Sequence, residues 1–309
     1  MKFIRSVPMA TCGLALGLAT LGNLLQPLPH GTMIRYILGV FSFAVLVLFA
    51  LKLFLDSPHA KEELKIPVPA SVLPTSTMTV MLLSTYIRPY FPDIAITIWY
   101  AAVITHICLM VFFFRRFVAN FVLGSVFPTW FVVLVGIVAV SVTAPAMNAV
   151  FIGQIAFYIG FLLYFIGLPL VVCRMRNVRI FPEPAQPTIA ILTAPMSLLI
   201  VGYFSSFVQQ GYVNETLIYV MLVIAVASYL YVTVMMFSLL RIKFYPTYAA
   251  FSFPYVISAI AFRLGADFLA ARGFEFFVPI AQVTLWIAVV AVVFVVLHYI
   301  RYFVFWLKF

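Results

Sequence analysis

The sequence predicts an all-α integral membrane protein with ten transmembrane helices, arranged as five tandem helical hairpins in one domain over residues 1–309. Hydrophobic residues make up 66% of the chain and charged residues only 8%, whereas soluble domains are about half apolar and about a quarter charged. A soluble core of this size could not bury so much apolar surface. The composition therefore excludes a soluble enzyme, a secreted disulfide scaffold and a DNA-binding domain.

Ten apolar runs are long enough to be spans, because a helix needs about 20 apolar residues to cross the bilayer core. They cover about 6–26, 33–55, 71–90, 93–114, 124–145, 147–173, 186–207, 213–240, 245–268 and 275–303. The first run follows two basic residues, as a signal peptide would, but Pro8 and several glycines interrupt it and no clear cleavage site follows. We interpret it as a retained span. The five hairpins are then about 6–55, 71–114, 124–173, 186–240 and 245–303.

The positions of lysine and arginine predict how the spans cross the membrane. Fourteen basic residues fall at the two termini and in the loops after even spans, against three in the opposite loops, and Arg263 lies inside span 9. The fourteen are Lys2, Arg5, Lys52, Lys61, Lys65, Arg115, Arg116, Arg174, Arg176, Arg179, Arg241, Lys243, Arg301 and Lys308, and the three are Arg35, Arg88 and Arg272. Because basic loops are enriched on the cytoplasmic side, we expect a multi-pass plasma-membrane protein with both termini in the cytoplasm. Topology thus explains the net charge of +10, and we expect the lipid bilayer, not nucleic acid, as a partner.

A Pro-Thr pair recurs near the start of the odd spans. It begins at Pro74, Pro128, Pro187 and Pro246, at intervals of 54, 59 and 59 residues, and Pro8 opens the first span. Proline is favoured in the first turn of any helix, but that preference does not explain the repeated threonine or the near-constant interval. We therefore predict a repeat whose unit is one helical hairpin.

Odd and even spans differ in polarity. Windows over the odd spans hold 19 Ser or Thr in 97 residues, and windows over the even spans hold 8 in 126. The odd spans also carry Pro195 and Pro254, which we expect to kink their helices. Lipid offers no hydrogen-bond partner to side-chain hydroxyls or to backbone groups that a proline leaves unpaired. The odd helices are therefore predicted to lie inside, around a central pore, and the even helices outside, facing lipid.

The repeat suggests a pore constriction. Seven residues beyond each marker proline stand Ala15, Met81, Val135, Ala194 and Phe253. If the repeats superpose, these five residues line the pore as one layer, and Phe253 is the largest of them. The alternative is that Phe253 is one of 33 phenylalanines and simply packs.

The ionisable residues offer little for catalysis or coupling. None of the eight Asp and Glu lies at the middle of a span, and no catalytic triad, phosphate loop or metal cluster is recognisable. We expect no enzymatic activity, no cofactor and no bound metal. Arg263 and Asp267 are spaced for an i,i+4 ion pair near the outer end of span 9; alternatively, Arg263 provides an outer anion contact.

Three segments resemble a known family: VPMATCGLALG at 7–17, FPTWFVVLVGI at 127–137 and FYPTYAAFSFPYVISAIAF at 244–262. They are similar to the tellurite-resistance/dicarboxylate transporter family, which includes the slow-type anion channels of plant guard cells and fungal malate permeases. The resemblance covers the whole chain. It implies a ring of five helical hairpins with a pore in each protomer, a homotrimer, and a phenylalanine of the ninth span that occludes the pore. The matching residue here is Phe253.

We therefore expect an anion channel or facilitator that passes small inorganic or organic anions such as chloride, nitrate or carboxylates. Helix N-termini carry partial positive charge, and five of them would converge on the cytoplasmic mouth. The alternative is a proton-coupled C4-dicarboxylate (malate) secondary transporter or a tellurite-resistance exporter. The lack of deep carboxylates argues against proton coupling, because coupled pumps use such groups within the membrane. A third alternative is a structural membrane protein without a conduit.

Overall fold

The computed structural model describes residues 2–178 and 181–307, which are helical without strands. Within these ranges eight helices are long and apolar enough to cross a membrane: Gly31–Leu55, Pro67–Ile87, Pro92–Val118, Val150–Asn177, Glu183–Gln210, Glu215–Leu239, Pro246–Ala270 and Glu275–Phe305. Spans 1 and 5 of the prediction correspond to the shorter apolar helices Thr11–Leu25 and Val138–Met147, so for these two the count of ten still rests on the sequence pattern. Arg179 and Lys308, which enter the charge count, lie outside the described residues.

The segments that correspond to the even predicted spans (2, 4, 6, 8 and 10) are long, continuous helices with exposed apolar surfaces. They are α3 (Gly31–Leu55), α7 (Pro92–Phe113, continued by the π-helical turn η1, Phe114–Val118), α10 (Val150–Asn177), α12 (Glu215–Leu239) and α14 (Val278–Leu307). Only 22% to 33% of the residues in their most apolar windows are buried. Large side chains such as Phe41, Val223 and Trp286 point outward on them, and a contiguous apolar surface of this kind fits contact with lipid.

The segments that correspond to the odd predicted spans are interrupted in all but the first. They are α2 (Thr11–Leu25); α5 (Pro67–Val72) with α6 (Thr75–Ile87); α8 (Trp130–Leu134), α9 (Val138–Thr143) and η3 (Ala144–Met147); η4 (Glu183–Thr193) with α11 (Ala194–Ser206) and η5 (Val208–Gln210); and η6 (Pro246–Phe251) with α13 (Phe253–Ala270). Those of spans 3, 7 and 9 are 67%, 83% and 72% buried in their most apolar windows. Hydroxyls on these segments bond back to carbonyls three residues earlier, so they need no partner from lipid: Thr188 donates to Ala185 at 2.6 Å and Ser252 to Ala249 at 2.6 Å.

The helices of the odd spans contact one another in sequence, and the last one contacts the first. Helix α2 packs on α6, α6 on α9, α9 on α11, α11 on α13, and α13 returns to α2. Each also packs on the long helix that follows it in the chain: α3, α7, α10, α12 and α14 respectively. Small residues allow the close approach: a β-carbon on Gly202 would lie 2.6 Å from Val138 Cγ1. The five odd helices thus form a ring.

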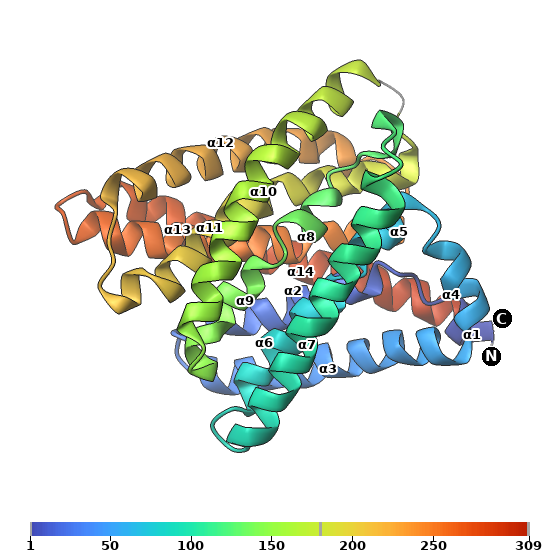
Figure 1. Ribbon diagram of the computed structural model, residues 1–309, viewed down its shortest axis with the longest axis horizontal. Coiled ribbons are helices and arrows are strands. Elements are labelled where there is room, and N and C mark those ends of the chain that lie inside the picture. The colour runs from blue at the N-terminus through green and yellow to red at the C-terminus, as the bar shows by residue number, and fades with distance from the viewer. Residues whose placement is uncertain (1, 179–180, 308–309) are drawn as a thin grey trace.

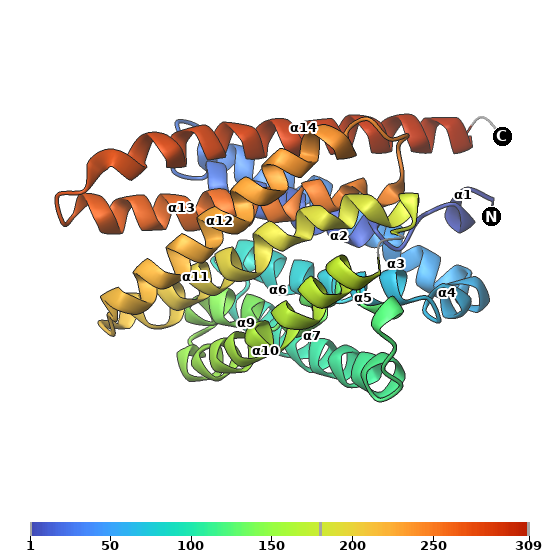
Figure 2. The ribbon, with the colours of Figure 1, turned by 90° about the horizontal axis from the view of Figure 1, so that it is seen from above.

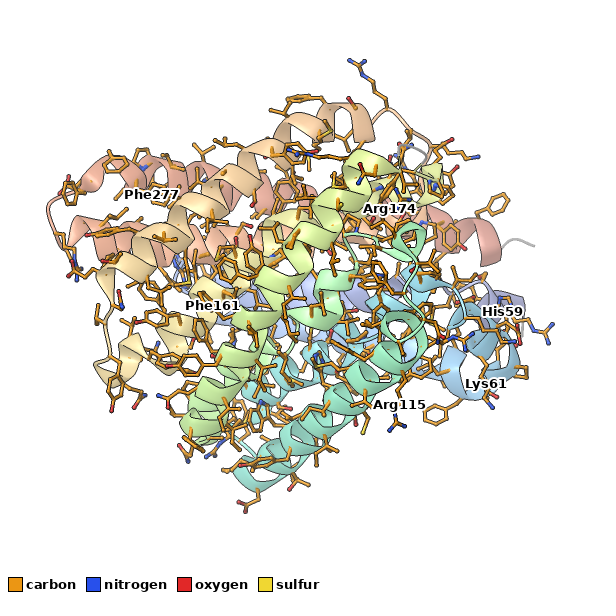
Figure 3. All side chains as sticks on the ribbon, turned by 45° about the horizontal axis from the view of Figure 1, so that its top comes forward. His59, Lys61, Arg115, Phe161, Arg174 and Phe277 are labelled. Carbon is orange, nitrogen blue, oxygen red and sulfur yellow. The ribbon has the colours of Figure 1, made fainter. Side chains whose placement is uncertain are left out.

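The two ends of the molecule are distinct. Both termini lie at one end, together with α4 (Ser57–Glu63), and the turns from α2 to α3 and from α13 to α14 lie at the other (Figures 1 and 2). Figure 3 shows His59, Lys61, Arg115 and Arg174 toward the end that carries the termini, and Phe277 at the opposite end. The basic residues that the charge count assigns to one side therefore gather at one end wherever the figure labels them.

Candidate functional site

A cavity of about 290 Å³ lies between the first halves of the odd segments, at the end of the molecule that carries the termini. All five segments contribute to its wall, through Gly13, Met78, Val135, Ala194 and Phe253 among others. Its lining is apolar apart from Thr75, Thr188, Thr247 and one charged residue, Glu63. The cavity therefore occupies the axis of the ring.

Three of the five residues predicted to form one layer lie together in this wall: Val135, Ala194 and Phe253. Ala15 and Met81 are fully buried between helices and do not line the cavity; Gly13 and Met78 take these places. Seven residues turn through about 700° in an α-helix but about 840° in a 3₁₀ helix. The segments after the marker prolines differ in helix type, because η4 and η6 are 3₁₀ helices, α6 is an α-helix and α8 ends before Val135. The same count from the marker proline therefore reaches different faces.

Pro195 and Pro254 do not interrupt continuous α-helices. Each is the second residue of an α-helix, α11 and α13, and follows a 3₁₀ segment. A proline loses no hydrogen bond in the first turn of an α-helix. The two prolines therefore mark the points where the helix type changes inside a span.

Phe253 begins α13 and is partly buried in the cavity wall. The residue before it, Ser252, donates hydrogen bonds to the carbonyls of Ala249 at 2.6 Å and of Gly13 at 3.3 Å. The second bond reaches across to α2. The backbone that carries the Phe253 ring is thus tied to the neighbouring helix of the ring.

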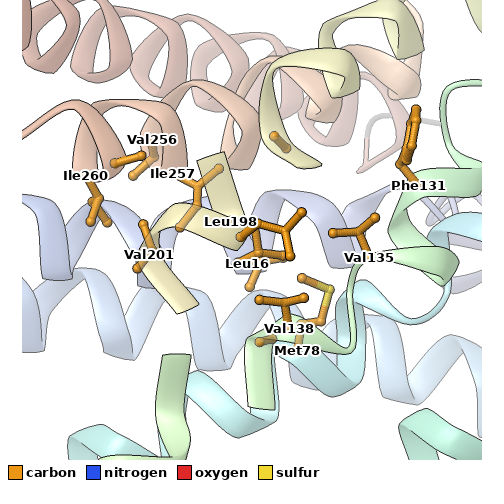
Figure 4. Packing of buried hydrophobic residues seen from close by; sticks show 14 of the residues in the cluster. Leu16, Met78, Phe131, Val135, Val138, Leu198, Val201, Val256, Ile257 and Ile260 are labelled. Atoms are coloured by element: carbon orange, nitrogen blue, oxygen red, sulfur yellow. The ribbon is translucent and has the colours of Figure 1, made fainter. Parts of the chain in front are cut away.

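Beyond the cavity the axis is filled by aliphatic side chains. Leu198 lines the cavity and lies beside Leu16 in Figure 4, between Val135 on one side and Val201 and Ile257 on the other. All five side chains are nearly or fully buried. Between α11 and α13, the Ser197 and Ser258 hydroxyls are 3.0 Å apart. The cavity therefore ends against a layer of packed aliphatic side chains that includes Leu198 of its own wall.

Arg263 lies near the opposite end of the ring. Its Nη1 donates to the carbonyl of Leu24 at 3.1 Å, and among the described residues it forms no ion pair with Asp267. Arg35 donates from Nε to Asn23 Oδ1 at 2.8 Å. The last carbonyls of a helix lack intrahelical partners and carry partial negative charge. Arg263 therefore caps the C-terminal end of α2 through the Leu24 carbonyl, and Arg35 contacts a side chain of the same end.

Sequence reasoning missed the pairing of Lys52 with Glu63. The Lys52 side chain is fully buried, and its Nζ lies 2.6 Å and 2.8 Å from the two Glu63 carboxylate oxygens. In the sequence analysis Lys52 counted only as a topology marker, and Glu63 only as one of the eight acidic residues. Lys52 falls inside predicted span 2, and a charge within a span is itself a signal of a specific partner.

No group of His, Cys, Asp or Glu in the described part of the chain could hold a metal ion. A family model described as voltage-dependent anion channel (SLAC1) matches residues 4–301. Comparison with individually curated proteins gives no match. The family match spans nearly the whole chain, including every segment of the ring.

Proposed function

Because the chain belongs to the voltage-dependent anion channel (SLAC1) family, we propose that it is an anion channel or facilitator that passes small inorganic or organic anions along the axis of the five-helix ring. One observation carries the proposal: a single cavity receives lining residues from all five odd segments. A chance gap between two helices would be lined by residues of those two helices and not by residues of all five repeats. We further propose that the protein acts as a homotrimer with one such path in each protomer.

The cavity attracts anions in this proposal through helix ends. The first residues of α6, α11 and α13, which are Thr75, Ala194 and Phe253, all line it. The N-terminal end of a helix carries roughly half a positive charge, which acts here through the dipole, because the Ala194 amide already donates to the carbonyl of Ile191. An apolar wall with converging positive dipoles favours a weakly hydrated anion and disfavours a cation.

The proposed orientation places both termini, and therefore the cavity, on the cytoplasmic side of the plasma membrane. The fourteen-to-three distribution of basic residues supports this orientation. A cytoplasm-negative potential then drives anions outward by about 2.3 kcal/mol per charge per 100 mV. Efflux is the favoured direction.

Phe253 is the proposed gate. It lines the cavity from the N-terminus of α13, and its ring is the largest of the side chains at that level. Pro254 and Pro195 provide the changes of helix type beside it, and Arg263 is proposed to contact anions at the outer mouth. The described cavity wall contains no carboxylate deeper than Glu63, so no observation favours a proton-coupled dicarboxylate transporter or a tellurite exporter.

The test is current through purified protein in planar bilayers under an asymmetric salt gradient. A reversal potential that follows the anion gradient supports the proposal, and one that follows the cation gradient contradicts it. A bi-ionic series with chloride, nitrate, formate and malate then ranks the permeant anions.

A further inference from the structure

The only charge in the described wall of the cavity is a carboxylate, that of Glu63, which is an unexpected group beside an anion path. Behind it lies the Lys52 ammonium, which contacts both carboxylate oxygens at 2.6 Å and 2.8 Å. We propose that Lys52 is an anion-binding site of the cavity mouth and that the Glu63 carboxylate is its tethered, exchangeable occupant. This inference rests on the proposed function and extends it, since it assigns an anion-binding site on the proposed path.

The buried Lys52 ammonium requires a negatively charged partner. Its side chain is 0% exposed, and apolar side chains are buried in the same region, among them Phe49, Ala60 and Leu73. A buried ammonium without a counter-charge is strongly destabilising. The nearby Asp56 carboxylate lies 3.6 Å from Arg5 Nε through Oδ1, and no ion pair between Asp56 and Lys52 is formed among the described residues. Glu63 is therefore the anion that Lys52 holds.

The Glu63 carboxylate, in contrast, is partly exposed and can move away from Lys52. Its side chain is 21% exposed and lines the cavity, and it is the last residue of α4, where the helix gives way to a turn. Its other polar contact is His59 Nε2, at 3.1 Å from Oε1, and that ring is itself exposed. The carboxylate thus stands between a buried cation and the space through which anions are proposed to pass.

The geometry defines the class of ligand. One ammonium that contacts two oxygens of a planar carboxylate accepts formate, acetate or nitrate in the same way, because lysine acts as a compact point charge with three donors. A small monovalent oxoanion that enters from the cavity would take the position of the Glu63 carboxylate.

The experiment removes the tethered carboxylate and supplies a free one. Glu63→Ala is purified in detergent, and its thermal unfolding midpoint is measured against sodium formate at constant ionic strength set with sodium gluconate. Glu62→Ala is the matched control, because Glu62 is the adjacent residue and forms an exposed pair with Lys65 at 2.6 Å. The double variant Lys52→Met/Glu63→Ala removes the site itself.

Formate is expected to raise the midpoint of Glu63→Ala in a saturable manner, since a ligand of the folded state stabilises it by mass action. The unsubstituted protein, Glu62→Ala and the double variant should respond little. If Glu63→Ala unfolds during purification, formate is included from solubilisation onward. Recovery of folded protein that depends on formate supports the site, and failure of formate to restore folding overturns it.

The proposal is also overturned if Glu63→Ala responds no more than Glu62→Ala, or if the double variant keeps the formate response. None of these readouts requires the pore to conduct. A protein that shows formate rescue but no anion current would contradict the channel proposal alone, and a conducting protein without rescue would contradict the Lys52 site alone.

Discussion

Gly17 of α2 faces Ser252 so closely that a β-carbon on Gly17 would lie 2.5 Å from Ser252 Oγ and 3.0 Å from the backbone nitrogen of Phe253. Helix α2 therefore sets the position of the backbone from which the Phe253 ring enters the cavity. The absence of a side chain at residue 17 is a condition for that position.

Gly17→Ala is expected to destabilise the protein by about 1–3 kcal/mol, because overpacking a close contact against backbone forces helices apart. Gly13→Ala is the control, since its β-carbon would lie 3.6 Å from Ala249 Cβ, an ordinary contact. Thermal unfolding in detergent measures both. Equal midpoints for the two variants would show that α2 does not hold the Ser252–Phe253 backbone in place.

Phe253→Ala is expected to raise anion current in bilayers, because it removes the ring of the proposed gate from the wall of the path. Phe251→Ala is the matched control: Phe251 lies two residues away, is 1% exposed and does not line the cavity. That variant should lose stability without gaining current. Unchanged or lower current in well-folded Phe253→Ala would count against the gate.

Leu198→Ala is expected to add to the effect of Phe253→Ala, because Leu198 lies at the end of the cavity against the aliphatic layer. The double variant should pass more current than Phe253→Ala, whereas Leu198→Ala alone should pass little while the phenylalanine ring is present. Leu199→Ala, at a neighbouring fully buried position outside the cavity wall, is the control for packing loss. Identical currents for the double variant and Phe253→Ala would mean that the aliphatic layer is no barrier.

Cysteine labelling tests the orientation. Cys108 and Cys173 are exposed and Cys12 is buried, so single cysteines are introduced after Cys108→Ala and Cys173→Ala. Glu62→Cys, in α4, should react with an impermeant maleimide only from the cytoplasmic side. Gln210→Cys, an exposed position in η5, should react from outside intact cells. The reverse pattern would invert the proposed direction of the path.

The sequence itself determined the features that depend on composition and period. These features are the runs of about 20 apolar residues, the distribution of basic residues and the uneven share of hydroxyls between odd and even spans. Each is a property of a single segment, because each segment meets the requirements of the bilayer by itself. The recurrent Pro-Thr pair also located the broken segments, and counting from it led to Val135, Ala194 and Phe253 in one cavity wall.

The tertiary structure decided what depends on helix type and on partners from elsewhere in the chain. It placed Gly13 and Met78 in the wall instead of Ala15 and Met81, because 3₁₀ and α-helical turns rotate side chains by different angles. It also gave Arg263 the carbonyl of Leu24 as a partner and Lys52 the carboxylate of Glu63. The partner of a buried charge is whichever group the folded chain brings within about 3 Å, and no local pattern encodes that distance.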